Sequence, residues 1–322
     1  MRKIKVGVLG CGNISSIYFE NLTKTFDNVE VYACSDLVES KAMEAAAKYS
    51  VPNVMTFGEM LEDDNIEIIL NITTPQGHYP LTKKALIAGK HVYVEKPLSL
   101  KFEEGCELVE IAAQKGLLLG GAPDTFMGAG IQTCLNLIKD DVIGEIVGAN
   151  AFMVCHGHES WHPDPEFYYK KGGGPLFDMG PYYLTALVNL VGGVKEVSGM
   201  STMAFPHRKI TSNPKNGTVI DVEVPTHVSA LLRFKNGAVA HLLTSFDVWD
   251  SVLPRIEIYG TKGSLLVPDP NTFGGPVMLS LPDGKGFREV NITLPFSENS
   301  RGIGLSDMAD CILTGKSPKA GS

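Results

Sequence analysis

Two glycines near the start of the chain have the spacing of a phosphate-binding loop. Gly10 and Gly12 follow an apolar run that predicts a strand and precede a segment with helical periodicity. The first glycine permits a tight turn, and the second lets backbone N–H groups approach a pyrophosphate at the positive end of the helix. We therefore expect Gly10, Gly12, Asn13 and Ile14 to bind a cofactor. Ser15 replaces the third glycine of the usual pattern, and the glycine pair alone is equally typical of an ordinary strand-to-helix turn.

An aspartate at the end of the second predicted strand supports the nucleotide interpretation. Asp36 lies about 25 residues beyond the glycines, where a carboxylate can accept hydrogen bonds from the adenosine ribose. Together these residues predict dinucleotide binding. The carboxylate would repel a 2′-phosphate, and the next residue is Leu37 rather than an arginine, so we expect NAD in preference to NADP. Lys41 is near enough in sequence to soften that preference.

A lysine between a glutamate and a proline is the first candidate for chemistry on a substrate. Glu95, Lys96 and Pro97 follow a short apolar run. Because a residue before proline avoids helical geometry, we expect the Lys96 amine at the carboxyl edge of a sheet, where α/β proteins bind ligands. An ammonium group there can bind a substrate hydroxyl, stabilise an alkoxide and relay its proton. The alternative is a surface lysine paired with Glu95, which composition alone favours.

These residues require a parallel sheet to position them. From the start to about Gly120, runs rich in Val and Ile alternate with segments of helical periodicity, as in βαβ units. We expect strands at Lys3–Leu9, Val29–Ser35, Ile66–Ile72, His91–Val94 and Leu117–Gly120. We expect helices at Ile14–Thr25, Val38–Tyr49, His78–Ala88 and Phe102–Lys115. The pattern predicts an N-terminal Rossmann domain, a doubly wound parallel sheet, over residues 1–122.

The pattern of predicted strands and helices changes after about Pro123, which predicts a second domain over residues 123–322. One helix, Gly128–Asp140, is followed by strands joined by turns rather than helices. Thr226–Phe234 and Ala238–Phe246 flank Asn236-Gly237, a pair that suits a tight antiparallel hairpin. We expect an α+β domain with a large, mostly antiparallel open sheet.

Composition excludes several function classes. The chain has 28 Lys and Arg against 36 Asp and Glu, a net charge of −8, which disfavours nucleic acid as a partner. No apolar stretch is long enough to cross a bilayer, so we expect no membrane partner. The six cysteines form no Cys-x-x-Cys pair, which argues against a disulfide framework or a structural zinc site and favours a cytoplasmic location.

Several motifs together resemble the Gfo/Idh/MocA family of oxidoreductases. They are the glycine loop, Gly89-Lys90-His91-Val92 before Glu95-Lys96-Pro97, Thr74-Pro75 with His78, and Gly172-Gly173-Gly174 followed by Asp178. The resemblance covers nearly the whole chain. It implies an NAD(P)-dependent dehydrogenase or reductase that moves a hydride between nicotinamide and a hydroxyl-bearing carbon of a sugar, inositol or related polyol.

The resemblance also implies roles for residues of the first domain. Lys96 would be the central catalytic residue, with the peptide bond to Pro97 often cis. The expected cofactor contacts then extend to Thr73, Thr74, Pro75, His78, Glu95 and Lys96. The alternative for His78 is a residue that only caps or positions the helix after Thr74-Pro75.

A tyrosine stands where the family most often has a histidine. Tyr182 lies four residues after Asp178, a spacing that predicts both side chains on one helix face. The resemblance, in its variant similar to glucose-fructose oxidoreductase and dihydrodiol dehydrogenase, implies that Tyr182 is the acid/base and Asp178 a further catalytic residue. A phenol with an ordinary pKa of about 10 needs a nearby cation for this role, which Lys96 could supply. The alternative is a structural tyrosine that packs against Leu184.

The polar and aromatic segment 156–169 is the expected substrate loop. By position it matches the loop after the first long strand of the family's second domain. We expect the substrate to contact His156, Trp161 and His162 together with Lys96, Asp178 and Tyr182. The alternative is a metal site, because His156 and His158 would share a strand face; its further ligands would be Glu159, His162 and Asp164. We expect no metal.

Two other function classes exist among similar proteins. One uses tightly held NAD for redox-assisted glycosidic cleavage, and the other is a non-catalytic regulator that senses a sugar and NAD. The resemblance further implies a homodimer or homotetramer. Family members commonly continue beyond the segment matching Arg301–Thr314 into a helix that packs on the first domain, so we expect this chain, which stops at Ser322, to be a truncated or shortened form.

Overall fold

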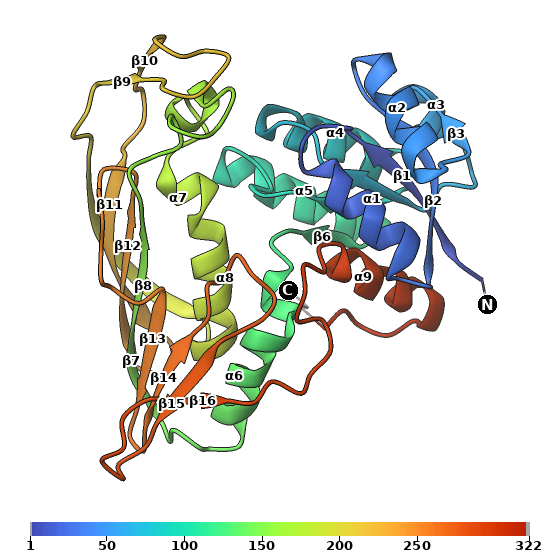
Figure 1. Ribbon diagram of the computed structural model, residues 1–322. Helices are drawn as coiled ribbons and strands as arrows, with labels where there is room; N and C mark the ends of the chain where they lie inside the picture. The colour runs from blue at the N-terminus through green and yellow to red at the C-terminus, as the bar shows by residue number, and fades with distance from the viewer. Residues whose placement is uncertain (1, 320–322) are drawn as a thin grey trace. The chain divides into compact units, whose positions relative to one another are not determined.

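The structure, a computed structural model, describes residues 2–319 and divides into two compact units (Figure 1). Within the described residues, the first unit comprises 2–124 together with 299–319, and the second comprises Thr125–Glu298. No helix in the described part of the chain is long and apolar enough to span a membrane.

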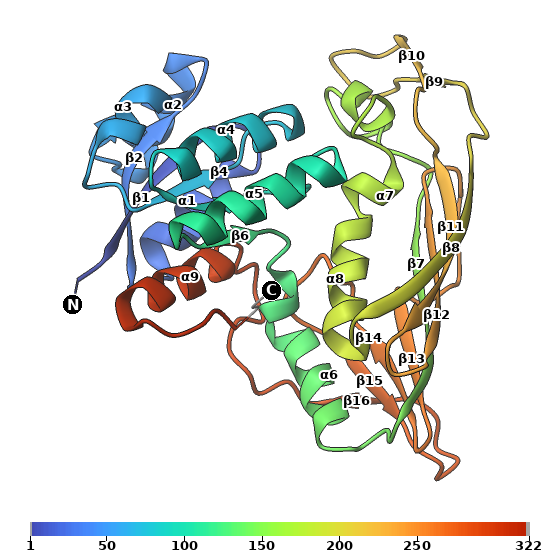
Figure 2. The same cartoon turned by 180° about the vertical axis from the view of Figure 1, so that it is seen from behind.

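The first unit is built on a six-stranded parallel sheet in the order β3-β2-β1-β4-β5-β6, with helices on both faces (Figure 2). Its strands are β1 (Ile4–Leu9), β2 (Val29–Ser35), β3 (Asn53–Val54), β4 (Ile68–Asn71), β5 (His91–Val94) and β6 (Leu119–Gly121). Its helices are α1 (Ser15–Lys24), α2 (Glu39–Tyr49), α3 (Phe57–Glu62), α4 (Pro75–Ile87), α5 (Phe102–Lys115) and α9 (Ile303–Thr314). The strand order reverses between β1 and β4, the position at which doubly wound sheets bind ligands.

Two short elements of this unit were not expected from the sequence. Helix α3 begins with a capping box, in which the Thr56 side chain accepts from the Glu59 backbone and the Glu59 side chain accepts from the Thr56 backbone. The spacing Thr-x-x-Glu is a known start signal, so this helix was predictable. Strand β3 has two residues and lies at the sheet edge, and so short a strand leaves no periodicity to detect.

The segment from residue 299 to 319 corrects the predicted domain division. It was expected in the second domain but belongs to the first unit, and the boundary lies at Asp124 rather than residue 122. The buried Asp124 carboxylate accepts hydrogen bonds from the N–H groups of Gly302 (2.8 Å) and Gly304 (3.2 Å) at the start of α9. The Asn21 amide donates to the Arg301 carbonyl at 2.8 Å. These contacts join residues far apart in sequence, so no local pattern announces them.

The second unit contains an eight-stranded sheet in the order β16-β15-β14-β13-β7-β12-β11-β8, in which only the β7–β12 pair is parallel. Its strands are β7 (Ile146–Val154), β8 (Val194–Thr202), β11 (His227–Phe234), β12 (Val239–Ser245), β13 (Ile256–Gly260), β14 (Ser264–Val267), β15 (Val277–Ser280) and β16 (Arg288–Val290). A separate pair consists of β9 (His207–Lys209) and β10 (Val219–Asp221). The predicted fold class is confirmed.

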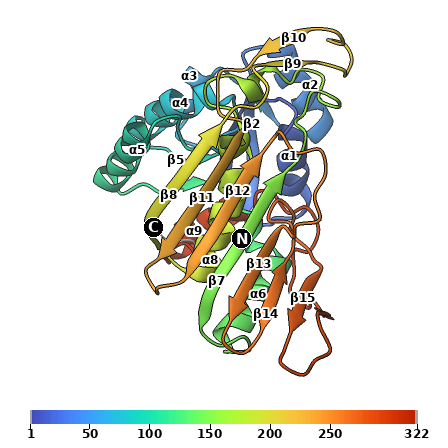
Figure 3. The same ribbon diagram turned by 90° about the vertical axis from the view of Figure 1, so that its left-hand side faces the viewer.

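Helices cover one face of the large sheet, and its other face is seen in Figure 3. The unit also contains α6 (Ala129–Lys139), α7 (Pro175–Asp178), α8 (Gly180–Val191), and the 3₁₀ turns η1 (Thr125–Met127) and η2 (Glu166–Tyr169). Residues of α6 and α8 share one hydrophobic core with the inward side chains of the strands. The expected hairpin is present: Phe234 N–H donates to the Ala238 carbonyl at 2.9 Å, and Gly237 has φ +93°.

Candidate active site

The glycine loop has the shape that a pyrophosphate requires. Gly10 has φ +107°, and a Cβ there would lie 2.8 Å from the Ile72 carbonyl oxygen, so only glycine fits. A Cβ on Gly12 would meet nothing within 4 Å, so protein packing does not require this glycine. The space beside Gly12 lies at the N-terminus of α1, which has no side-chain cap. Ser15 is accommodated at the third glycine position, where its hydroxyl donates to the Gly12 carbonyl at 2.6 Å.

The Asp36 carboxylate joins this loop to the end of β2. One oxygen accepts from the Cys11 N–H at 2.8 Å, and the other accepts from the Val38 N–H at 2.9 Å. Each carboxylate oxygen can accept a further hydrogen bond, so both remain available to ribose hydroxyls. The side chain of the following Leu37 is fully exposed and presents no cation there. The loop and Asp36 therefore fit the adenosine half of a dinucleotide.

His78 connects the loops that follow β4 and β5. Its imidazole lies 2.6 Å (Nδ1) from the Pro97 carbonyl oxygen and 3.1 Å (Nε2) from the Thr73 carbonyl oxygen, and the residue is 1% exposed. Burial lowers the pKa of His78, and the two carbonyls act in the opposite direction. Thr74 is the N-cap of α4, and Pro75 is its first residue. The contacts support the positioning role that the sequence left open for His78.

Glu95, the residue that follows β5, is buried rather than at the surface. Its carboxylate accepts from the Tyr18 hydroxyl at 2.8 Å and from the Lys96 backbone N–H at 2.8 Å. Burial, followed by the nearby Glu95 charge, raises the pKa of Tyr18. The peptide bond between Lys96 and Pro97 is cis, in agreement with the family resemblance. Lys96 is thus the second residue after β5, at the carboxyl end of the strand.

Asp178 and Tyr182 belong to two helices rather than one. Asp178 is the last residue of α7, Met179 intervenes, and Tyr182 is the third residue of α8. The expectation of one continuous helix face was wrong because Pro181 has no N–H to continue the hydrogen-bond ladder. Tyr182 is 7% exposed and belongs to the hydrophobic core of the second unit.

A histidine that the sequence did not assign to catalysis pairs with Asp178. The Nε2 atom of His158 lies 3.3 Å from an Asp178 carboxylate oxygen, and His158 is 8% exposed. Its Nδ1 atom is buried and has no hydrogen-bond partner in residues 2–319. Because the Asp178 carboxylate accepts hydrogen bonds, it favours the His158 tautomer that carries its hydrogen on Nε2. The Nδ1 atom of His158 is then a hydrogen-bond acceptor. From the sequence, His158 was expected only as a possible metal ligand, because no local pattern links it to Asp178.

The glycine run brings these two side chains together. A Cβ on Gly173 would lie 2.5 Å from the Phe167 and Tyr168 carbonyl oxygens, so the backbone segments approach too closely for a side chain. Gly174 N–H donates to the Tyr168 carbonyl at 2.6 Å. The Tyr168 ring in turn lies 4.2 Å from the His158 ring, centroid to centroid. The run therefore holds η2 against the start of α7.

The structure corrects the idea that His156 and His158 share a strand face. Strand β7 ends at Val154, and Gly157 between the histidines has φ +82°. His156 stacks on Trp249 with centroids 3.3 Å apart, whereas His158 contacts Asp178. Glu159 and Asp164, two other ligands of the alternative metal site, form ion pairs with Arg208 and Lys215. The described residues contain no group of three or more His, Cys, Asp or Glu side chains that could hold a metal ion.

A buried arginine supports the substrate loop from below. The Arg208 side chain, 3% exposed, forms ion pairs with Glu159 at 2.6 Å and with Asp247, and donates to the Phe246 carbonyl at 2.7 Å. Burial alone raises the pKa of Glu159, but hydrogen bonds from Tyr169 and Arg208 outweigh it and hold that pKa below its usual range. The sequence did not predict this cluster.

The two remaining predicted substrate residues lie on the same loop. Trp161 is 61% exposed, and its ring meets the His158 ring edge-on at 5.2 Å. His162 Nδ1 accepts from the Asp164 N–H at 3.0 Å, which leaves the ring neutral with hydrogen on Nε2. Burial lowers the pKa of His162, consistent with the neutral ring. His162 is therefore a hydrogen-bond donor through Nε2.

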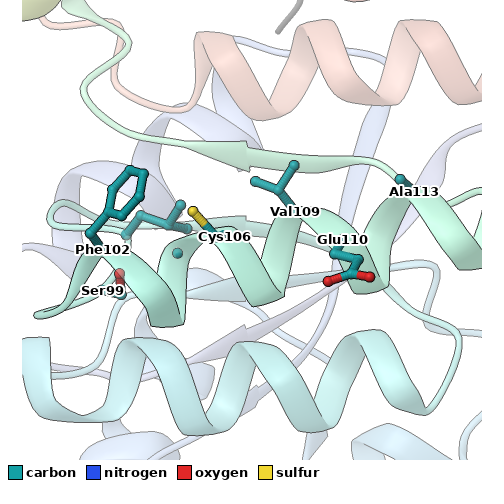
Figure 4. Close-up of a pocket in the computed structure, with 8 residues that line it drawn as sticks. Ser99, Phe102, Cys106, Val109, Glu110 and Ala113 are labelled. Carbon is teal, nitrogen blue, oxygen red and sulfur yellow. The ribbon is translucent and has the colours of Figure 1, made fainter.

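An open groove of about 560 Å³ lies along α5 in the first unit (Figure 4). Its lining is mostly apolar and includes Leu98, Phe102, Cys106 and Val109. It contains none of the predicted site residues and one charged side chain, Glu110. We therefore do not regard it as the active site.

Comparison with known protein families gives two matches. Residues 4–121 match the family described as "Oxidoreductase family, NAD-binding Rossmann fold", and residues 131–266 match "GFO/IDH/MocA C-terminal domain". Both matched ranges thus belong to the family that the motifs suggested.

Curated relatives extend the match. Myo-inositol 2-dehydrogenase of Thermotoga maritima is 26% identical over 98% of this chain and 89% of its own length. The NADP⁺-linked scyllo-inositol 2-dehydrogenase IolW of Bacillus subtilis is 30% identical over 82% of this chain and 68% of its own length. An uncharacterised oxidoreductase of Schizosaccharomyces pombe, C115.03, is 30% identical, but the chain spans only 53% of its length.

A solved structure shares the fold. Levoglucosan dehydrogenase in complex with NADH and levoglucosan superimposes with a TM-score of 0.83 over 99% of this chain and 92% of that chain, at 20% identity.

Proposed function

We propose, since the chain belongs to the Gfo/Idh/MocA family of oxidoreductases, that it transfers a hydride between NAD and a hydroxyl-bearing carbon of a sugar, inositol or related polyol. The observation that carries this proposal is the carboxyl edge of the first unit's sheet. The glycine loop follows β1, the loop held by His78 follows β4, and Lys96 follows β5, three neighbouring strands. A cofactor loop and a fixed amine at one sheet edge suit a dehydrogenase.

When bound, nicotinamide would accept or give the hydride. The Lys96 amine would hold the substrate hydroxyl and stabilise the negative charge that forms on its oxygen. Tyr182 would take or return the hydroxyl proton, and Asp178 would orient it by hydrogen bonding. Lys96 belongs to the first unit and Tyr182 to the second, so each role is proposed from the chemistry of the residue itself.

His158 would act through Asp178 as a positioning residue. A hydrogen bond from its Nε2 fixes the carboxylate, in the way that a carboxylate orients histidine in other catalytic pairs. The buried neighbours Tyr168 and Phe246 limit the movement of the imidazole, with centroid distances of 4.2 and 4.6 Å.

NAD is the preferred cofactor in this proposal. The support is the Asp36 carboxylate at the end of β2 and the apolar, exposed Leu37 beside it. A 2′-phosphate would meet negative charge there. One curated relative is NADP⁺-linked, so the preference requires measurement. Tighter binding of NADPH than of NADH in a fluorescence titration would overturn it.

Self-association through the large sheet is also proposed. Leu231 and Val239, 55% and 43% exposed, alternate along β11 and β12 with the core residues Leu232 and Ala240, so they lie on the sheet face opposite the helices. Apolar surface of this kind favours contact with a second copy of the chain. We expect a homodimer or homotetramer by light scattering, and a monomer at micromolar concentration would contradict this.

The unpaired cysteines bear on the cellular location. All six cysteines are unpaired, which suits a reducing, cytoplasmic environment.

The test is a panel of sugars, inositols and acyclic polyols assayed for NAD reduction at 340 nm. We expect turnover with at least one of them, and Tyr182→Phe should bind NADH like the parent enzyme while turnover falls about 10²-fold or more. Wild-type activity in Tyr182→Phe would show that the tyrosine is structural. Absence of turnover with the whole panel would count against the dehydrogenase itself.

A further inference from the structure

An exposed indole lies beside the substrate loop, on the connection between β12 and β13. Trp249 is 79% exposed, and one face of its ring is covered by His156, with planes 14° apart. Phe205, 38% exposed, meets the His156 ring edge-on at 5.6 Å. The outer face of the indole remains open. Large aromatic surfaces left in water beside a site often mark a place where a ligand binds.

These aromatic residues stand on a rigid base. Asp247, two residues before Trp249, accepts from the Thr226 hydroxyl at 2.7 Å and pairs with the buried Arg208. The Ala204 N–H, next to Phe205, donates to the same carboxylate at 3.4 Å. The guanidinium of Arg208 also lies 4.8 Å from the centre of the Phe205 ring. The base thus contacts the Phe205 ring and anchors the backbone close to Trp249 before any ligand arrives, which lowers the entropic cost of binding.

The aromatic platform formed by Trp249, His156 and Phe205 lies next to the proposed catalytic groups of the same unit. His156 is separated from His158, the partner of Asp178, by Gly157 alone. Two residues span at most about 7 Å. A Cβ on Gly157 would lie 2.3 Å from a Glu159 carboxylate oxygen, and its φ is +82°, so this geometry requires glycine. The backbone positions of His156, which contacts Trp249, and His158, which contacts Asp178, are therefore close enough for two linked sugar rings to bridge.

The chemistry of the platform suits a carbohydrate ring. The C–H faces of sugars are apolar and pack on aromatic rings, while their hydroxyls need polar partners. The indole N–H is a hydrogen-bond donor on a side chain that is mostly exposed. We propose that Trp249, His156 and Phe205 form a second sugar subsite, so that the preferred substrate is a disaccharide or other glycoside rather than a free monosaccharide. This inference rests on the proposed function.

The experiment compares three variants on matched sugars. Wild type, Trp249→Ala, Trp161→Ala and Phe102→Ala are assayed with glucose, maltose and cellobiose and with galactose and lactose, in the presence of NAD, and binding is followed in parallel by calorimetry. We expect the wild type to prefer a disaccharide. Trp249→Ala should raise KM for it about tenfold or more, a larger factor than for the monosaccharide.

The other variants are controls. Trp161→Ala should weaken both sugar classes, because Trp161 contacts His158, and Phe102→Ala on α5 should change neither. Equal KM increases for both classes in Trp249→Ala would overturn the second subsite while leaving the dehydrogenase intact. A lower molar mass of Trp249→Ala by light scattering would show instead that the indole, with the exposed Val252 and Leu253 beside it, contacts a second copy of the chain. If the enzyme oxidises inositols or acyclic polyols but neither binds nor oxidises any of these sugars, the second subsite is overturned and the proposed dehydrogenase stands. If it oxidises no compound of the whole panel, the proposed function itself is refuted.

Discussion

The sheet edge of the first unit and the substrate loop of the second unit are built in different ways. At the sheet edge, the predicted functional residues lie near strand ends, and short sequence patterns such as Gly10-x-Gly12 or Lys96-Pro97 mark them. In the substrate loop, His156 and His158 depend on Trp249, Arg208 and Asp178, which are distant in sequence. The sheet edge can therefore be predicted from sequence motifs, whereas the arrangement of the substrate loop depends on tertiary contacts.

The largest expected effect separates chemistry from folding at the sheet edge. Lys96→Ala removes the amine that would stabilise the developing alkoxide, so kcat should fall about 10³-fold. The substitution leaves the glycine loop and Asp36 unchanged, so NADH should bind to the variant as tightly as to the wild type. The measurements are NAD reduction at 340 nm and NADH fluorescence titration. Loss of NADH binding together with activity would show that Lys96 supports the fold of the loop rather than the reaction.

The next effect tests the long-range construction of the substrate loop. Arg208→Met leaves Glu159 and Asp247 buried without their cation, which should cost about 3–5 kcal/mol of unfolding free energy. As a control, Lys215→Met breaks an exposed pair with Asp164 and should cost less than about 1 kcal/mol. Urea unfolding curves measure both. Similar losses in the two variants would mean that the buried cluster does not support the loop.

A third prediction concerns the long-range contact between Asp124 and the start of α9 in the first unit. Burial raises the pKa of Asp124 to about 6 against the hydrogen bonds from Gly304 and Gly302. The unfolded carboxyl ionises first, near its ordinary pKa of 3.8, so this group lowers stability as pH rises from about 4 to 6 and adds no further change above that. The difference corresponds to about 3 kcal/mol.

Asp124→Asn isolates this contribution. The amide oxygen can still accept from the start of α9, but it does not titrate. Unfolding free energies of wild type and variant, measured from pH 4 to 7, should therefore diverge in slope, with the wild type losing more stability as pH rises. Parallel curves would show that Asp124 is ionised in the folded protein over the whole range.

The smallest effect distinguishes the two loop glycines. Gly12→Ala places a methyl group in open space, so stability should stay within about 0.5 kcal/mol, while the affinity for NADH should fall about tenfold. Gly10→Ala instead meets the Ile72 carbonyl at a positive φ and should lose about 1–3 kcal/mol of stability. Thermal unfolding and NADH titration of both variants provide the comparison. Full NADH affinity in Gly12→Ala would place the pyrophosphate elsewhere.

The same contrast explains what could be predicted from sequence. Strands β2 and β5 and helix α5 agree with their expected bounds, because buried parallel strands and amphipathic helices carry their pattern locally. The cis Lys96–Pro97 bond and the placement of Lys96 after β5 were likewise expected. The break between Asp178 and Tyr182 was missed although Pro181 signals it.

Other features left no local signal. The pairing of His158 with Asp178 and the ion pairs of Arg208 join separate loops through tertiary packing. The return of α9 to the first unit involves Asp124, which precedes Gly302 by 178 residues. Such contacts can be found only once the sheets have brought the segments together.

The central claim is hydride transfer that depends on Lys96 and Tyr182, and an isotope experiment tests it directly. The polyol with the fastest NAD reduction is prepared with deuterium on its carbinol carbon, and the cofactor product is analysed by mass spectrometry after one turnover. The account predicts one deuterium on the reduced nicotinamide with wild-type enzyme, and almost no labelled cofactor with Lys96→Ala or Tyr182→Phe over the same time. Appearance of the label in water, or labelling at the wild-type rate in both variants, would contradict it.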